Sequence, residues 1–237
     1  MKKNLKKIIK AIVKFLVFFL SKINIGRFVL EELNRSISNN KKVIVYKDLK
    51  LKFYIPNRLS YYRIETFSTK EPETLNWIDK FEKKTTFWDV GANIGLYSCY
   101  AAKNKECKVY AFEPSIFNLE WLGKNIFLNK LVEKIFEFST MGISMDEAKN
   151  LLKIPQPMYI KIDVDGIEYL ILKGGEKVLL NTKELLIEVN EKFTEQKNNC
   201  DKYLKELGFS LREKKRSNLF KNTDYSTSYN QIWVRQT

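Results

Sequence analysis

The sequence predicts an α/β protein whose core is a doubly wound, mostly parallel sheet, with an antiparallel C-terminal edge and an N-terminal cap. From Thr86 onward, short apolar runs typical of strands alternate with longer runs of helical period, as repeated β-α units do. After Gly208 two strand-like runs, FSLREKK and YNQIWVR, follow each other without a helix between them. That arrangement favours an antiparallel pair at one edge of the sheet.

Three parts are expected along the 237 residues: a basic helical leader over 1–30, a cap over 31–84 and the main domain over 85–237. Within the cap, residues 43–56 alternate well enough for a hairpin or two short strands, and Pro72 suits the first position of a helix. No linker-like or repeated stretch interrupts the chain, so we expect one hydrophobic core.

Composition excludes several classes of site. The chain has no histidine, so Ser-His and Cys-His nucleophile pairs and histidine metal ligands are absent. Three cysteines stand at no metal-ligand spacing, which argues against a zinc site or a disulfide framework and fits a reducing compartment. The net charge is +14, but eight basic residues precede the first acid, Glu31. The excess charge therefore belongs largely to the leader.

The leader has the pattern of a basic amphipathic helix. Its basic side holds Lys3, Lys7, Lys10 and Lys14, and its apolar side holds Ile8, Ile12, Phe15, Leu16 and Phe19. A membrane span needs about 20 apolar residues, whereas the run Ile8–Leu20 is shorter and contains two lysines. We expect residues 1–22 to lie on an anionic membrane surface, which makes the protein cytoplasmic and peripheral at the inner face. A core or oligomer helix and a signal or anchor segment are the alternatives.

A glycine-rich turn, DVGANIG, connects the first strand of the main domain to the next helix. Its spacing is G-x-x-x-G, with Asn93 where a dinucleotide fingerprint has its middle glycine. Glu113 ends the second strand, the usual position of a ribose-binding acid in such sheets. The turn and the acid together favour a cofactor with an amino acid head and a ribose. The plain alternative is a simple β-α connection.

Four blocks of the main domain resemble the FkbM-type S-adenosylmethionine-dependent methyltransferases: DVGANIGLYS, YAFEPSIFNLEWLGKNIFLN, YIKIDVDGIEYLILKGG and LLIEVN. The upstream stretch KEPETLNWIDKF is similar to members of that family as well. The resemblance implies a Rossmann-like class I methyltransferase fold over 85–237, S-adenosylmethionine as cofactor, and O-methylation of a sugar hydroxyl on a surface polysaccharide or glycan. It also implies that the cofactor is held by Asp89, Gly91, Ala92, Asn93 and Gly95 at the methionine end, and by Glu113 with Pro114 at the ribose.

Three carboxylates are the catalytic candidates, because they follow the ends of neighbouring parallel strands. Asp163 and Asp165 come at the end of the fourth strand, and Glu188 ends the fifth. One of them is expected to take the proton of the acceptor hydroxyl, or together they hold a divalent cation that acidifies it. In the plainer alternative Asp163 caps a helix or contacts the cofactor, and Glu188 is a satisfied structural group.

One segment departs from the family pattern. Residues Leu131–Met158, between the third and fourth strands, are several dozen fewer than the family usually has, which leaves open a catalytically weakened or inactive cofactor-binding protein at the membrane. A nucleic-acid methyltransferase is disfavoured, because DVDG stands where base-modifying enzymes carry an Asn-Pro-Pro-aromatic element. No nucleic acid partner is therefore expected. The glycine spacing disfavours a dehydrogenase.

Overall fold

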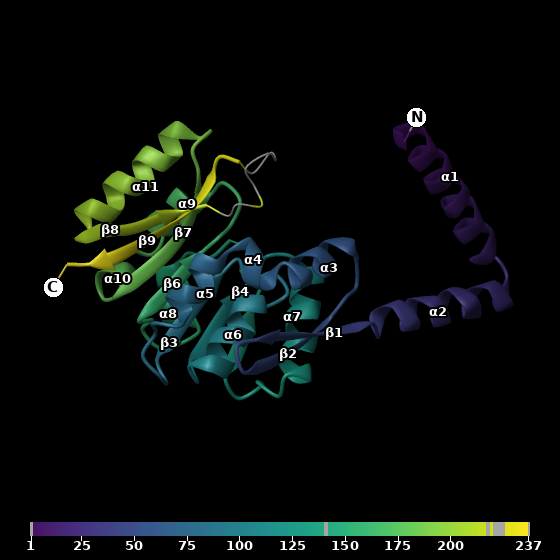
Figure 1. The fold of residues 1–237 in the computed structure, drawn as a ribbon, viewed down its shortest axis with the longest axis horizontal. Coiled ribbons are helices and arrows are strands. Elements are labelled where there is room, and N and C mark those ends of the chain that lie inside the picture. Colours follow the sequence, from purple (N-terminus) through teal and green to yellow (C-terminus); the bar gives the residue numbers. More distant parts are fainter. Residues whose placement is uncertain (1, 140–141, 217–218, 220–225, 237) are drawn as a thin grey trace.

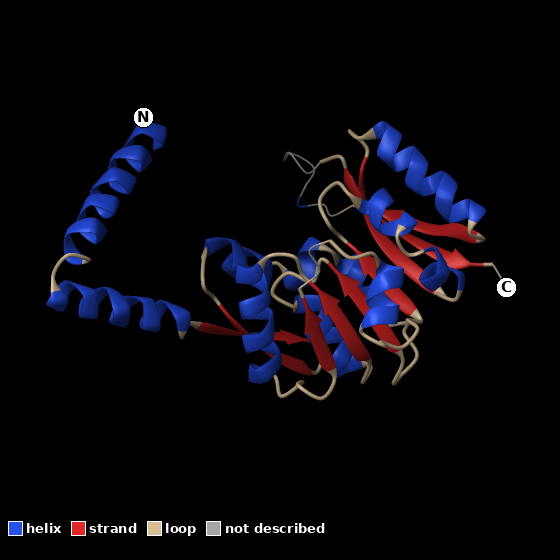
Figure 2. Cartoon of the chain, turned by 180° about the vertical axis from the view of Figure 1, so that it is seen from behind, coloured by secondary structure: helices blue, strands red, loops and turns tan. Residues whose placement is uncertain are grey.

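The computed structural model describes residues 2–139, 142–216, 219 and 226–236. Its centre is a seven-stranded sheet in the order β5-β4-β3-β6-β7-β9-β8. β3 to β7 run parallel, and β9 pairs antiparallel with both β7 and β8 (Figure 2). The predicted fold class is confirmed. The strands are β3 Thr86–Val90, β4 Lys108–Phe112, β5 Ile135–Phe138, β6 Tyr159–Ile162, β7 Glu184–Asn190, β8 Phe209–Lys215 and β9 Ser228–Arg235.

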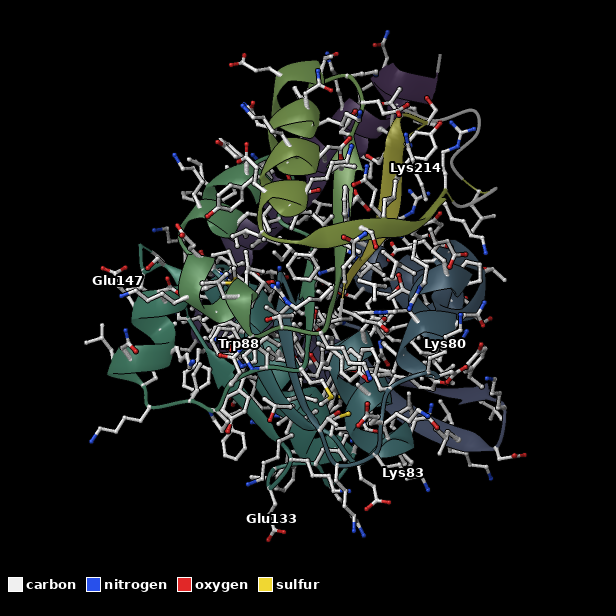
Figure 3. The ribbon with its side chains drawn as sticks, turned by 90° about the vertical axis from the view of Figure 1, so that its left-hand side faces the viewer. Lys80, Lys83, Trp88, Glu133, Glu147 and Lys214 are labelled. Carbon is white, nitrogen blue, oxygen red and sulfur yellow. The ribbon has the colours of Figure 1, made fainter. Side chains whose placement is uncertain are left out.

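Helices cover both faces of this sheet, and each face has its own cluster of buried side chains. Along β3, Phe87 belongs to one cluster and Trp88 to the other, as the alternation of a strand requires. Figure 3 shows Trp88 inside the body of the molecule, whereas Glu133 points away from it. The first face packs against α5 Pro72–Ile78, α6 Leu96–Asn104, α7 Ile116–Leu128 and the hairpin of β1 Lys41–Tyr46 and β2 Leu49–Tyr54. The second face packs against α8 Met145–Leu151, α9 Glu168–Lys173, α10 Glu176–Leu180 and α11 Thr194–Glu206.

The described part of the crossover between β5 and β6 contains the helix α8, which is anchored at its start. Ser144 and Glu147 form a reciprocal capping box there. The Asp146 carboxylate accepts hydrogen bonds from the backbone N–H groups of Lys177 and Val178, at 3.1 and 2.9 Å, and so ties α8 to α10. The crossover therefore covers its face of the sheet despite its length.

The N-terminal helices α1 Lys2–Leu20 and α2 Asn24–Ser38 stand apart from the body, to which β1 connects them (Figure 1). They pack against each other at a tight corner, where a Cβ on Gly26 would lie 2.3 Å from the carbonyl oxygen of Leu20. The expected boundary at residue 30 falls inside α2, which continues to Ser38. Among the described helices, none is both long and apolar enough to cross a membrane.

Two short helices of the cap, α3 Arg58–Glu65 and α4 Phe67–Lys70, complete the structure. Asn57 caps α3, since its side chain accepts a hydrogen bond from the Ser60 N–H at 2.9 Å. Ser60 and Ile64 are buried on the inner side of this helix. The cap is thereby fixed over the carboxyl ends of the parallel strands.

Candidate active site

A cavity of about 380 Å³ opens at the carboxyl ends of β3, β4, β6 and β7. The strand order reverses between β3 and β6, and open α/β sheets bind their ligands at such a switch point. The walls are formed by the loop after β3, the turn after β4, residues 161–165 and the cap helices α3 and α4. Its volume lies within the roughly 300–1,000 Å³ typical of small-molecule sites.

Two positions of the loop after β3 require glycine, because other segments of the same chain leave no space for a side chain there. Gly91 has φ +86°, and a Cβ there would lie 1.9 Å from the backbone oxygen of Asp163 at the end of β6. Gly95 has φ +85°, and its Cβ would lie 2.4 Å from a methyl carbon of Leu122 in α7. Asn93 also has a positive φ, a conformation that asparagine tolerates better than most residues. The loop is thus shaped by strand and helix packing.

Glu113 lies buried on the cavity wall and holds the loop in place. One carboxylate oxygen accepts from the backbone N–H of Asn93 at 2.7 Å. The other accepts from the Ser115 N–H at 2.9 Å and from the Asn118 side-chain amide at 3.2 Å. Because a carboxylate has about four acceptor positions, this arrangement leaves about one for a ribose hydroxyl. Pro114 and Ala92 line the same cavity.

Two buried oxygens near the loop have no hydrogen-bond partner in the described part of the chain: Oδ1 of Asp89 and Oδ1 of Asn93. The other Asp89 oxygen accepts from the Ser98 hydroxyl at 2.5 Å, and burial raises the pKa of Asp89. Asp89 lies beneath the loop, while Asn93 is on the cavity wall. Unpaired buried acceptors are costly, and an ammonium donor such as that of an amino acid satisfies them. The residues present therefore fit the predicted cofactor.

A second group of acids lies on the β6–β7 side of the cavity. Glu71, Asp163 and Glu188 place one carboxylate oxygen each within 4.8 Å of one another. Glu71 comes from the junction of α4 and α5, so the cap supplies part of the site. Asp165, the third predicted carboxylate, is exposed at the cavity rim and does not belong to this group.

Lysines neutralise two of these three acids. Lys161, itself buried, donates to Asp163 at 2.8 Å, and Lys70 forms an ion pair with Glu71. The hydroxyl of Tyr97 also donates to Glu71, at 3.0 Å. The side chain of Glu188 has no hydrogen bond or ion pair with the described residues.

The pKa values of Asp163 and Glu188, the acids at the ends of β6 and β7, are shifted in opposite directions by their surroundings. Burial raises the pKa of Glu188 well above its ordinary value, and the Asp163 and Glu71 carboxylates add to the rise. Burial also pushes the pKa of Asp163 upward, but the Lys161 ammonium and then Lys70 outweigh it and hold that pKa below its ordinary value. Among the two strand-end acids, Glu188 is therefore the one whose pKa is shifted upward, the direction that favours proton transfer by a carboxylate.

Lys70, Lys161 and Tyr97 were not among the residues predicted for the site. Only Lys161 had a local signal, since a lysine inside the otherwise apolar strand run YIKI is unusual in a central parallel strand. The placement of the cap, which no local pattern encodes, brings Lys70 to the cavity and Glu71 beside Asp163 and Glu188.

The raised pKa of Glu188 predicts the sign of a pH effect on stability. The folded chain holds this proton more tightly than the unfolded chain, whose pKa is near the ordinary 4.5. The stabilising contribution is thus fully present below about pH 4.5 and is lost as pH rises through the raised folded pKa. Glu188→Gln should therefore raise the free energy of unfolding near pH 8 and leave it unchanged near pH 4, as measured by denaturant unfolding. A difference that does not vary with pH would contradict this.

The strand order, the glycine loop at the switch point and the acid after β4 define a class I methyltransferase architecture. Residues 133–211 match the Methyltransferase FkbM domain, which confirms the predicted family resemblance. The matched stretch contains both Asp163 and Glu188.

Known proteins resemble the chain to different extents. It is 26% identical over 143 residues to the hexuronic acid methyltransferase AglP of Haloferax volcanii, a match that covers 48% of this chain and 59% of that relative. TYW2 of M. jannaschii, solved with AdoMet, has a TM-score of 0.52 at 15% identity, over 83% of this chain and 87% of that one. The precorrin-6y C5,15-methyltransferase of Geobacter metallireducens GS-15 has a TM-score of 0.52 at 13% identity, over 70% and 87%. These structures share the fold.

Proposed function

We propose that this protein transfers a methyl group from S-adenosylmethionine to a hydroxyl of a sugar in a polysaccharide or other glycan. The observation that carries the proposal is that the glycine loop with Glu113 and the Glu188 carboxylate line the same cavity. The name of the relative AglP, which states a hexuronic acid as its substrate, supports a sugar acceptor.

The proposed roles follow from the contacts. Bound cofactor supplies a methyl group on a positively charged sulfur, so the protein's task is to align the acceptor and remove its proton. Asn93 would accept a hydrogen bond from the amino end, with Asp89 as a buried acid beneath the loop, and Glu113 would accept a hydrogen bond from the ribose. Glu188 would take the hydroxyl proton.

A divalent cation is the less favoured role for the same acids. Asp163 and Glu71 already carry ion pairs with Lys161 and Lys70, so an additional cation would have to displace or repel two ammonium groups. These two ion pairs leave Glu188 as the acid for proton transfer, and they disfavour metal binding by the cluster.

The proposal is tested with the full chain, labelled S-adenosylmethionine and a panel of sugar glycosides. Cofactor binding by calorimetry together with label transfer to a sugar supports it. Cofactor binding without transfer to any sugar of the panel would favour the alternative of a non-catalytic cofactor-binding protein.

We also propose that residues 1–22 hold the protein at the anionic inner face of the membrane. In α1 the side chains of Ile8, Ile12, Phe15 and Phe19 are all more than half exposed, and Lys7 and Lys10 are exposed as well. An exposed apolar face flanked by lysines fits an interface between acyl chains and anionic headgroups.

Deleting residues 1–22 should release the protein from vesicles that contain phosphatidylglycerol, since it removes both the apolar face and the lysines. Affinity for S-adenosylmethionine should stay within about twofold, because α1 stands apart from the cavity. Vesicle sedimentation and calorimetry measure the two effects, with phosphatidylcholine vesicles as the uncharged control. Continued sedimentation of the truncated chain with anionic vesicles would refute the assignment.

A further inference from the structure

Arg63 is a cation on the cavity wall that no acid of the described chain neutralises. It lies in the last turn of α3 and lines the cavity, yet no hydrogen bond or ion pair joins its guanidinium to another described side chain. The two other cations of this region, Lys70 and Lys161, each form an ion pair with a carboxylate. Arg63 therefore differs from these two lysines in having no ion-pair partner among the described residues.

The helix, and not an acid, holds Arg63 in place. Leu59, Tyr62 and Arg63 follow i, i+3, i+4 spacing and all line the cavity, so one face of α3 is directed into it. On the inner side Ser60 and Ile64 are buried with 3% and 1% of their surface exposed. The guanidinium is presented to the cavity by a helix that is capped and packed before any ligand arrives.

The charges around Arg63 leave room for an anion. Arg63 and Asp163 both line the cavity, and the charge of Arg63 helps to lower the pKa of Asp163, but no ion pair joins the two described side chains. Asp163 is already paired with Lys161. A guanidinium matches a carboxylate through two parallel N–H donors, which an ammonium group does not offer.

We propose that Arg63 is a carboxylate-binding residue of this cavity. The assignment rests on the proposed function for the identity of its ligand, because two carboxylates enter such a site: that of the methionine end of the cofactor, and that of an acidic sugar on the acceptor. The partly exposed ring of Tyr62, one residue before Arg63, offers an apolar surface beside either ligand.

The experiment compares ligands that differ in the carboxylate. Arg63→Gln, Arg63→Lys and the control Arg58→Gln are titrated by calorimetry with four probes: S-adenosylmethionine, 5′-methylthioadenosine, methyl glucuronide and methyl glucoside. Arg58 is the matched control, since it is exposed on the same helix and does not line the cavity. Arg63→Gln should weaken one carboxylate-bearing probe by about 10–100-fold and leave its neutral counterpart within about twofold. Arg63→Lys should fall between, and Arg58→Gln should match the parent.

The affected probe identifies the source of the carboxylate. Loss of S-adenosylmethionine affinity assigns Arg63 to the cofactor, and loss of glucuronide affinity assigns it to the acceptor. Equal losses for charged and neutral probes, no loss at all, or a parent protein that binds neither carboxylate probe overturns the proposal. If the parent binds a carboxylate probe through Arg63 but transfers no methyl group, the proposed function fails and the assignment of Arg63 stands.

Discussion

Replacing Glu188 by glutamine is expected to reduce methyl transfer by roughly 10²–10⁴-fold, the usual contribution of a general base. Glutamine keeps the shape of the side chain but cannot take the proton of a sugar hydroxyl. Affinity for S-adenosylmethionine should stay within about twofold, since Glu188 belongs to the cluster with Glu71 and Asp163 and forms no hydrogen bond with the described glycine loop. Single-turnover transfer and calorimetry on the same preparation separate the two effects.

Two controls give this experiment its meaning. Glu133→Gln removes an exposed carboxylate that points away from the body and should behave as the parent (Figure 3). Chelation of divalent cations should leave the parent's turnover unchanged. If chelation stops turnover, or if Asp165→Asn causes the loss in place of Glu188→Gln, the proton-transfer role belongs elsewhere.

Gly91→Ala is expected to have the largest effect on the cofactor site. A Cβ at φ +86° is strained by about 1–3 kcal/mol, and here it would also lie 1.9 Å from the backbone oxygen of Asp163. Backbone cannot move aside as a side chain can, so the loop must shift away from β6. The melting temperature should fall by at least about 5 °C, and S-adenosylmethionine affinity should fall more than about tenfold.

Gly142→Ala is the matched control for this variant. Gly142 has φ +88°, but a Cβ there would have no heavy atom within 4 Å. Gly142→Ala introduces the strain of a positive φ without the close contact that Gly91→Ala makes with the backbone of Asp163, and it should leave cofactor affinity unchanged. Equal effects of the two substitutions would show that the approach of Asp163 to Gly91 is unimportant.

Most of the fold was predictable because its signals are local. Strand and helix periods along residues 86–235 gave the parallel sheet and the antiparallel edge, and both are present. The glycine loop and Glu113 were placed at the correct strand ends by the same pattern. The reason for a glycine at position 91 was not visible in the sequence, since the group that excludes a side chain there is the backbone oxygen of Asp163, directly after β6.

The acids of the site show where local reasoning ended. Asp163 and Asp165 look equivalent in KIDVDG, but positive φ values at Asp165 and Gly166 turn the chain outward after the strand. Asp163 therefore faces Lys161 and Glu188, while Asp165 reaches the exposed rim. The backbone turn, and not the residue type, separates the two carboxylates.

The sequence by itself determined the class of sheet, the glycine loop after the first parallel strand and the two strand ends that carry Asp163 and Glu188, because apolar periodicity and glycine conformation act within a few residues. Only the tertiary structure decided that the cap brings Glu71 beside Glu188 and places Arg63 on the cavity wall without an ion-pair partner in the described part of the chain. The charge state of a buried acid depends on which groups lose water together with it. That depends on packing between segments far apart in the chain, which no local pattern specifies.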